Sequence, residues 1–173
     1  MHYWRLFKII SAHSRMEHVT IRKARAADLD TLLLFEQGVI IAERPFDSTL
    51  KDDPLHYYDI PYMIDADHIE LLVAEQGNAL IGCGYARVES PGKHYLKHSL
   101  HGYLGFMYTD PNHRGKSVNK LIIEVLKQWC ISKNITELRL DVYHDNQPAI
   151  KAYEKVGFKR HMIEMRSDNG EMS

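Results

Sequence analysis

The segment from Tyr108 to Asn119 predicts a β-strand that passes through a turn into an α-helix. Apolar residues recur three and four positions apart from Val118 onward, so one face of this helix must pack against a core. The first amides of a helix have no partner inside the helix and attract anions, and Arg114 and Lys116 add positive charge beside them. The sequence therefore predicts a phosphate site at this junction.

The residues Gly115, Lys116 and Ser117 also match the end of the P-loop found in nucleoside triphosphatases. That motif needs a glycine five positions before Gly115, and this chain has Asp110 there. Hydrolysis of nucleoside triphosphates is therefore not expected, and the phosphate group must belong to another kind of ligand.

Hydrophobic patterning predicts strands and helices in a mixed order along the chain. Gly77 and Asn78 lie between two strand-like runs and predict a hairpin, and Gly157 predicts the end of the last helix. Antiparallel neighbours combined with strand–helix–strand units are typical of an α/β fold with a mixed sheet. The predicted strands cover residues 19–23, 69–75, 80–88, 100–109, 137–142 and 158–165. The predicted helices cover residues 29–40, 118–129 and 146–156, and Asp28 is expected to cap the first of them. Residues 43–61 are predicted to form an irregular segment with room for a short helix.

Composition restricts the class of protein. The chain has 22 basic and 23 acidic residues, so no positive field favours nucleic acid or a membrane as a partner. No apolar run approaches the roughly 20 residues of a membrane-spanning helix. The 173 residues fit one domain, which we expect at residues 16–173 after an extension of unknown role at residues 1–15. Cys83 and Cys130 lack paired metal spacing, and we expect reduced thiols in a cytoplasmic protein.

Two sequence blocks, DPNHRGKSVN at residues 110–119 and NQPAIKAYEKVGF at residues 146–158, resemble the GNAT superfamily of acyl-CoA-dependent N-acyltransferases. The order of elements resembles the same family from about Val19 to Arg166. The resemblance implies a mostly antiparallel central sheet, flanked by helices and splayed between its fourth and fifth strands. It also implies an N-acetyltransferase that moves an acetyl group from acetyl-CoA directly to a primary amine of a small molecule or peptide. Proteins that resemble this one are commonly homodimers.

The resemblance assigns a donor site as well. The gap between the splayed strands would take the pantetheine arm of acetyl-CoA, and the turn would take its pyrophosphate. Ser117 and Asn119 stand where the family has a glycine and a glycine or alanine, and such small residues let the backbone approach the pyrophosphate closely. A GNAT-like domain with impaired cofactor binding therefore stays open as an alternative. The implied cofactor-binding residues are Tyr108, Thr109, Arg114, Gly115, Lys116, Ser117, Val118, Asn119, Asn146 and Tyr153.

Catalytic roles also follow from the resemblance. Tyr153 lies two helical turns after Asn146, on nearly the same face of the predicted helix. The resemblance makes Tyr153 the general acid that protonates the departing thiolate, and the backbone amide of Tyr108 the donor to the oxyanion. The predicted fourth strand contains no carboxylate, so the general base stays open between His101, Glu36 and water.

The acceptor side is expected along the first helix and the irregular segment. Carboxylates and aromatic rings there suit a cationic amine, and Arg44 suits a substrate carboxylate. Peptide termini, amino acids, polyamines and aminoglycosides therefore all stay open as acceptors. The candidate residues are Glu36, Glu43, Arg44, Phe46, Tyr57, Tyr58 and Asp59.

A histidine-rich stretch supports a second hypothesis of a different class. His94, His98 and His101 have a spacing that would bring three imidazoles together in a helix. Pro91 and Gly92 precede them and a strand follows, which predicts a hairpin connection instead. The alternative is a non-enzymatic metal-binding or structural module, whereas the acetyltransferase is expected to hold no metal.

Overall fold

The computed structural model describes residues 19–167 and residue 170; the extension at residues 1–15 lies outside the described residues. A five-stranded sheet crosses the domain in the order β1-β2-β3-β4-β5. Pairing is antiparallel from β1 to β4 and parallel between β4 and β5, which confirms the predicted α/β fold with a mixed sheet. The strands are β1 (Val19–Lys23), β2 (Ile69–Gln76), β3 (Ala79–Glu89), β4 (His101–Thr109) and β5 (Leu138–Arg139).

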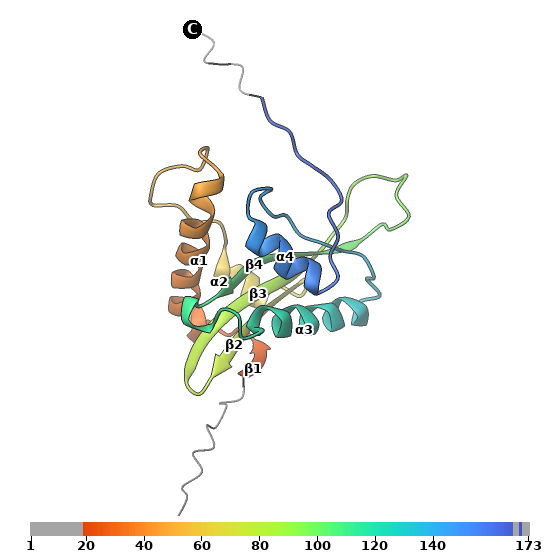
Figure 1. The fold of residues 1–173 in the computed structure, drawn as a ribbon. Helices are drawn as coiled ribbons and strands as arrows, with labels where there is room; N and C mark the ends of the chain where they lie inside the picture. The colour runs from red at the N-terminus through yellow and green to blue at the C-terminus, as the bar shows by residue number, and fades with distance from the viewer. Residues whose placement is uncertain (1–18, 168–169, 171–173) are drawn as a thin grey trace, which may run out of the picture.

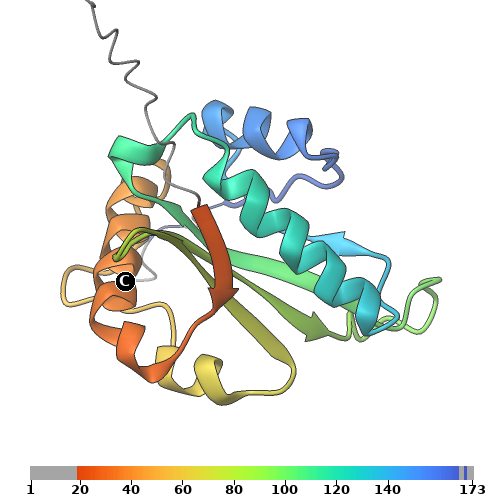
Figure 2. The ribbon, with the colours of Figure 1, turned by 90° about the horizontal axis from the view of Figure 1, so that it is seen from below.

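Helices cover both faces of the sheet (Figure 1). The helices α1 and α2 pack on one face, and α3 packs on the other with α4 beside it, as Figure 2 shows from below. Each face therefore has its own apolar core, with the sheet as the layer between them. The helices are α1 (Leu29–Glu43), α2 (Ile60–Asp65), α3 (Val118–Ser132) and α4 (Gln147–Lys155), with short 3-10 turns at Ala26–Asp28, Arg44–Phe46 and Pro111–His113.

The apolar run in β2 reflects this two-sided burial. Leu71 and Val73 point into the core below α1, whereas Leu72 and Ala74 point into the core below α3. All four side chains are at most 2% exposed. A strand with both faces buried needs apolar residues at every position, which is why β2 lacks the usual alternation.

The C-terminal part differs from the prediction. The strand expected at residues 137–142 shrinks to β5, and residues 158–165, expected as a last strand, form none. Two residues of β5 offer too short an edge to pair with a further strand. The last segment therefore leaves the sheet (Figure 1), with Met162 and Met165 exposed, and Arg166 forms an ion pair of 3.1 Å with Asp47.

The sheet opens between β4 and β5. The two strands pair only at Gly102 with Leu138 and at Tyr103 with Arg139. From Leu104 onward this edge of β4 pairs with no strand among the described residues. The splay expected between the fourth and fifth strands is present.

A β-bulge in β4 decides which backbone groups face this opening. The register with β3 shifts so that Phe106 and Met107 together oppose Gly84, and Phe106 has a φ of 53°. After the bulge, the Asp110 amide donates to the Ile81 carbonyl, so the Tyr108 amide also faces β3. The alternate amides, those of Met107 and Thr109, therefore face the open edge.

The loop that follows α1 is held by a buried carboxylate. Glu36 is 0% exposed and accepts hydrogen bonds from the backbone amides of Tyr57 and Tyr58 at 2.7 and 2.8 Å. Its second oxygen lies 2.7 Å from His56 Nδ1. A buried carboxylate is tolerated because each oxygen has a partner. This anchor attaches residues 56–58 to the middle of α1.

We expect Glu36→Ala to lower the free energy of unfolding by about 3 kcal/mol, because two buried amides lose their acceptor and a cavity is left. Urea denaturation measures the change. Asp30→Ala, in an exposed position on the same helix, serves as the control and should cost less than about 1 kcal/mol. Equal effects of the two substitutions would contradict the anchoring role.

Candidate active site

The opening beside β4 is bordered by the aromatic ring of Tyr108. This ring stacks on Phe35 of α1 with centroids 4.6 Å apart. Gly38, one turn further along α1, gives the ring its space, because a Cβ atom there would lie 2.4 Å from Tyr108 Cε2. The side chain of Tyr108 thus joins α1 to the end of β4, next to the predicted phosphate turn.

The backbone at this opening differs from the sequence-based interpretation. Tyr108 was expected to offer a free amide, but that amide is directed at β3, opposite Cys83. The amides that face the opening belong to Met107 and to Thr109, of which only Thr109 was a candidate. Gly84 and Gly105, two glycines within strands, were the available signal of the bulge that causes this change.

The phosphate turn has the geometry of an anion site. α3 begins at Val118, and the preceding Ser117 makes no side-chain cap to the first turn. The side chains of Arg114 and Lys116 are exposed beside these uncapped amides. Gly115 has a φ of 75°, in the left-handed region. The amides, the helix dipole and two cations therefore converge where the sequence predicts phosphate.

Ser117 and Asn119 are the two departures from the family's small residues, and each has a structural consequence. Ser117 adopts a φ of 63°, a conformation that glycine adopts without strain. The side-chain oxygen of Asn119 is buried and has no hydrogen-bond partner among the described residues. An unpaired acceptor at this place fits a ligand that carries N–H or O–H groups, such as the pantetheine arm of coenzyme A.

The helix α4 presents the second predicted block. Asn146 caps this helix, with its Oδ1 accepting from the Ala149 amide at 3.3 Å. Tyr153 is half-buried and lies edge-on to Phe158, with centroids 6.1 Å apart. Burial, and secondarily the charge of Glu43, raises the pKa of Tyr153 to about 12. The phenol therefore keeps its proton near neutral pH.

The two proposed bases lie in unfavourable places. Glu36 is fully buried, and both its oxygens are already engaged by the loop. His101 begins β4, about 26 Å along the strand from Thr109 at about 3.3 Å per residue, and it is 5% exposed. The His101 imidazole lies 3.5 Å from Glu89, and burial lowers its pKa. The structure brings neither side chain to the end of β4 where the opening meets the phosphate turn.

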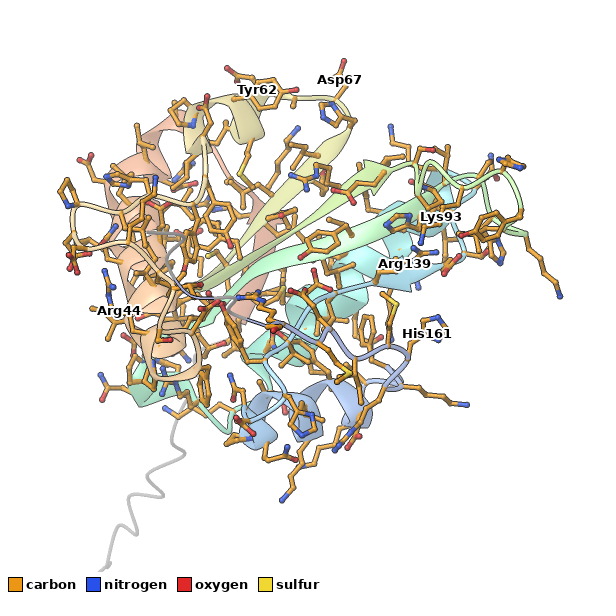
Figure 3. All side chains as sticks on the ribbon, turned by 90° about the horizontal axis from the view of Figure 1, so that it is seen from above. Arg44, Tyr62, Asp67, Lys93, Arg139 and His161 are labelled. Atoms are coloured by element: carbon orange, nitrogen blue, oxygen red, sulfur yellow. The ribbon has the colours of Figure 1, made fainter. Side chains whose placement is uncertain are left out.

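Apart from the buried Glu36, the candidates for the acceptor side divide into two groups. Arg44 is held by its own loop through Asp53 at 2.7 Å, and Figure 3 shows it at the outer end of α1, far from Lys93 and Arg139. Asp59 caps α2 by accepting from the Tyr62 amide at 3.1 Å. These two residues therefore have structural roles. The others, Glu43, Phe46, Tyr57 and Tyr58, gather with tyrosines of the sheet and of the segment before α4.

Sequence reasoning missed Tyr143, and it noted Tyr103 only as a polar residue of the predicted fourth strand. Tyr143 stacks on Phe46 with centroids 6.0 Å apart, and its hydroxyl donates to Asp47 at 3.2 Å. Tyr103 donates to Asp141 at 3.0 Å, further along the opening. No short-range pattern links these residues, because Tyr143 and Asp47 are brought together only by the fold.

The histidine-rich stretch forms no metal site in the part of the chain that the structure describes. His94 and His98 are exposed in the loop between β3 and β4, whereas His101 is buried in β4. No three His, Cys, Asp or Glu side chains among the described residues gather in a metal-binding arrangement. Within residues 19–167, no helix is both long and apolar enough to span a membrane.

Comparison with known families adds independent evidence. The sequence profile of the acetyltransferase (GNAT) family matches residues 35–158, which include the opening, the phosphate turn and α4. The chain belongs to the GNAT family. It is an acyltransferase, and its mixed sheet is the one expected from the two sequence blocks.

Several known proteins are similar to this GNAT chain. Streptothricin acetyltransferase from Escherichia coli is 41% identical over 46 residues, which cover 27% of this chain and 26% of that enzyme. A predicted acetyltransferase from Clostridium acetobutylicum, solved with acetyl-CoA, is 20% identical, with a TM-score of 0.65 over 87% of this chain and 96% of its own. AAC(6')-Iy, solved with the bisubstrate analogue CoA-S-monomethyl-acetylneamine, is 22% identical, with a TM-score of 0.65 over 87% of this chain and 99% of its own.

Ser117→Gly should make the protein more stable than Ser117→Ala by about 1 kcal/mol, because only glycine adopts a φ of 63° without strain. Chemical denaturation of both variants measures the difference. Gln128, an exposed position within α3, is the control. There the alanine variant should have a free energy of unfolding about 1 kcal/mol higher than the glycine variant. The same order of stability at both positions would contradict the strained turn.

Proposed function

We propose that this GNAT enzyme transfers an acetyl group from acetyl-CoA directly to a primary amine of a small molecule. The observation that carries the proposal is the juxtaposition of an uncapped, positively charged helix start with the open edge of β4. The pyrophosphate of acetyl-CoA suits the helix start, because its oxygens can accept hydrogen bonds from the uncapped amides. The amides of the extended pantetheine arm suit the open edge of β4, because they can form the hydrogen bonds that a neighbouring strand would otherwise supply.

Backbone groups would hold the acyl donor. The first-turn amides of α3, with Arg114 and Lys116, would bind the pyrophosphate. The amides of Met107 and Thr109 would face the arm and the acetyl carbonyl, so that one of them stabilises negative charge on the carbonyl oxygen. Acetyl-CoA supplies a thioester, which is an activated acyl group. The unpaired oxygen of Asn119 supports a bound ligand at this place.

Tyr153 would serve as the general acid. A phenol with a raised pKa is protonated near neutral pH and can give its proton to a departing thiolate, which is strongly basic. Asn146 would act by capping α4 and so fixing the position of the helix that carries Tyr153.

A multiply charged amine is the favoured class of acceptor. The acceptor side combines carboxylates with tyrosine rings, which suits ammonium groups through charge and cation–π contact. Streptothricin acetyltransferase and AAC(6')-Iy, by the names and ligand given above, point in the same direction. We therefore propose amino-sugar antibiotics and related polyamines as the first compounds to assay.

Acetyl-CoA should stabilise the protein against heat, because it binds the folded state only. At 100 times the dissociation constant, the expected gain is about 2.7 kcal/mol. Differential scanning calorimetry with and without acetyl-CoA measures it, and zinc chloride is the comparison for the metal-binding alternative. Stabilisation by zinc but not by acetyl-CoA would contradict the enzyme and favour a metal-binding module.

Tyr153→Phe should lower kcat by about 100-fold and leave the affinity for acetyl-CoA within about twofold, because the ring stays and only the proton donor is lost. Steady-state assays of CoA release and calorimetric titration measure the two quantities. Tyr95→Phe, in an exposed position of the β3–β4 loop, is the matched control. An unchanged kcat would remove Tyr153 from the acid role.

A further inference from the structure

Asp141 lies two residues after β5, beside the opening between β5 and β4. The Tyr103 hydroxyl donates a hydrogen bond to Asp141 Oδ2 at 3.0 Å. Tyr103 and Arg139 form the last residue pair of β4 with β5. Because the two strands run parallel, Asp141 lies further toward the end of β4 than Tyr103 does. The hydrogen bond therefore places the Asp141 carboxylate at the point where the strands part.

A chain of ring contacts joins Tyr103 to the loop after α1 and to the bulge of β4. The centroids of Tyr103 and Tyr85 lie 6.5 Å apart, and those of Tyr85 and Tyr58 lie 6.0 Å apart. Tyr58, in the loop, stacks on Phe106 with centroids 4.5 Å apart. Phe106 is the bulge residue that precedes Met107, whose amide faces the open edge. The carboxylate bound by Tyr103 is thus connected through packed rings to the backbone that would meet the acetyl carbonyl.

Asp141 has no cation to balance its charge. Within residues 19–167 it forms no ion pair, although two arginines flank its partner Tyr103. Arg87 of β3 opposes Tyr103 on one side, and Arg139 of β5 opposes it on the other. Each arginine is already paired with the glutamate two residues away in its own segment. A cationic group of a ligand would therefore supply the charge that Asp141 lacks.

This part of the sheet is accessible to a ligand. Asp141 is exposed, and the side chains of Arg87 and Arg139 are 40% and 37% exposed. Asp141 Oδ2 accepts from Tyr103, whereas Oδ1 accepts no hydrogen bond from any described residue. An ammonium group has three N–H donors, so it can bind the free oxygen and still contact neighbouring acceptors.

The carboxylate and the proposed acid lie on opposite faces of the sheet. Tyr103, which holds Asp141, packs against the core below α1, whereas Tyr153 packs against the core below α3. The thioester of acetyl-CoA would lie at the far end of the pantetheine arm from the pyrophosphate, and therefore back along β4 from the phosphate turn. In the opening it would have a carboxylate on one face and a phenol on the other.

We propose that Asp141 binds the ammonium group of the acceptor and then acts as the general base of the transfer, with Tyr103 as the positioning residue that holds its carboxylate. This inference rests on the proposed N-acetyltransferase function and names a base for it. His101 is buried on the closed side of the β4–β5 pairing, and Glu36 is engaged by its own loop. Asp141 is exposed and lies beside the opening itself.

The proton balance of this step closes. Asp141 takes one proton from the ammonium, and the neutral amine nitrogen forms a bond to the acetyl carbon. The carbon–sulfur bond breaks, and the thiolate takes the proton of Tyr153. The second proton of the attacking nitrogen restores the Tyr153 phenol, and Asp141 releases its proton to solvent. The products are the acetamide, free CoA and one proton, without any oxidant or metal.

The test measures kcat and KM for neamine and for spermidine, whose amines are protonated near neutral pH. We expect Asp141→Asn to lower kcat by about 100-fold and to raise KM, because the base and the counter-ion are both lost. The affinity for acetyl-CoA, measured by calorimetric titration, should stay within about twofold. Asp141→Glu should recover part of kcat, because it restores a carboxylate. Tyr103→Phe should lower kcat by about tenfold, because the carboxylate loses its fixed orientation.

Two controls separate catalysis from structure. Asp145→Asn removes the same charge at an exposed position four residues further on, and it should leave kcat and KM within about twofold. The melting temperature of Asp141→Asn should stay within about 2 °C of the wild type, because the side chain is exposed. An unchanged kcat in Asp141→Asn, or a rise in KM alone, would overturn the base role while leaving the transferase intact. A wild-type protein that acetylates neither amine would overturn the proposed function itself.

Discussion

The parting of β4 from β5 is the constraint on which the whole site depends. Only two residue pairs join these strands, and the bulge at Phe106 then turns the Met107 and Thr109 amides toward the open edge. A backbone edge without a strand partner is costly in a folded domain unless solvent or a ligand satisfies it. Within residues 19–167, the fold therefore keeps the outer edge of β4 without a strand partner beside a charged helix start. Both are backbone features that tolerate changes of side chain.

The elements that carry the proposed donor side were largely predictable from the sequence, whereas the contacts on the proposed acceptor side were not. The strand–turn–helix junction and the NQPAIKAYEKVGF block are short-range patterns, and the structure places both as expected. The direction of the Tyr108 amide was not predictable, because a one-residue bulge reverses it. Tyr143 and Asp47 meet through tertiary contact alone. The strand expected at residues 158–165 does not form, again for a reason of tertiary structure. Apolar and polar residues do alternate there, but β5 is too short to pair with a further strand.

Charge is distributed differently on the two sides of the opening. Among the described residues, Arg114 and Lys116 of the phosphate turn form no ion pair, although Asp110 lies in the same turn, and Glu43 at the end of α1 forms none either. Opposite excesses of charge favour an anionic donor at one end and a cationic acceptor at the other. A chain with a formal net charge of only −1 can thus carry local charges of opposite sign, which suits the anionic donor and cationic acceptor that we propose.

Glu36 fastens the acceptor loop through backbone amides of Tyr57 and Tyr58 rather than through their side chains. Peptide amides are the same for every residue type except proline, so this attachment survives most substitutions in the loop. Side chains on the proposed acceptor side can therefore be exchanged while the loop keeps its conformation. The loop is thus held by its backbone, whereas its side chains determine what it can contact. Single substitutions of these side chains could therefore change the acceptor while the fold stays intact.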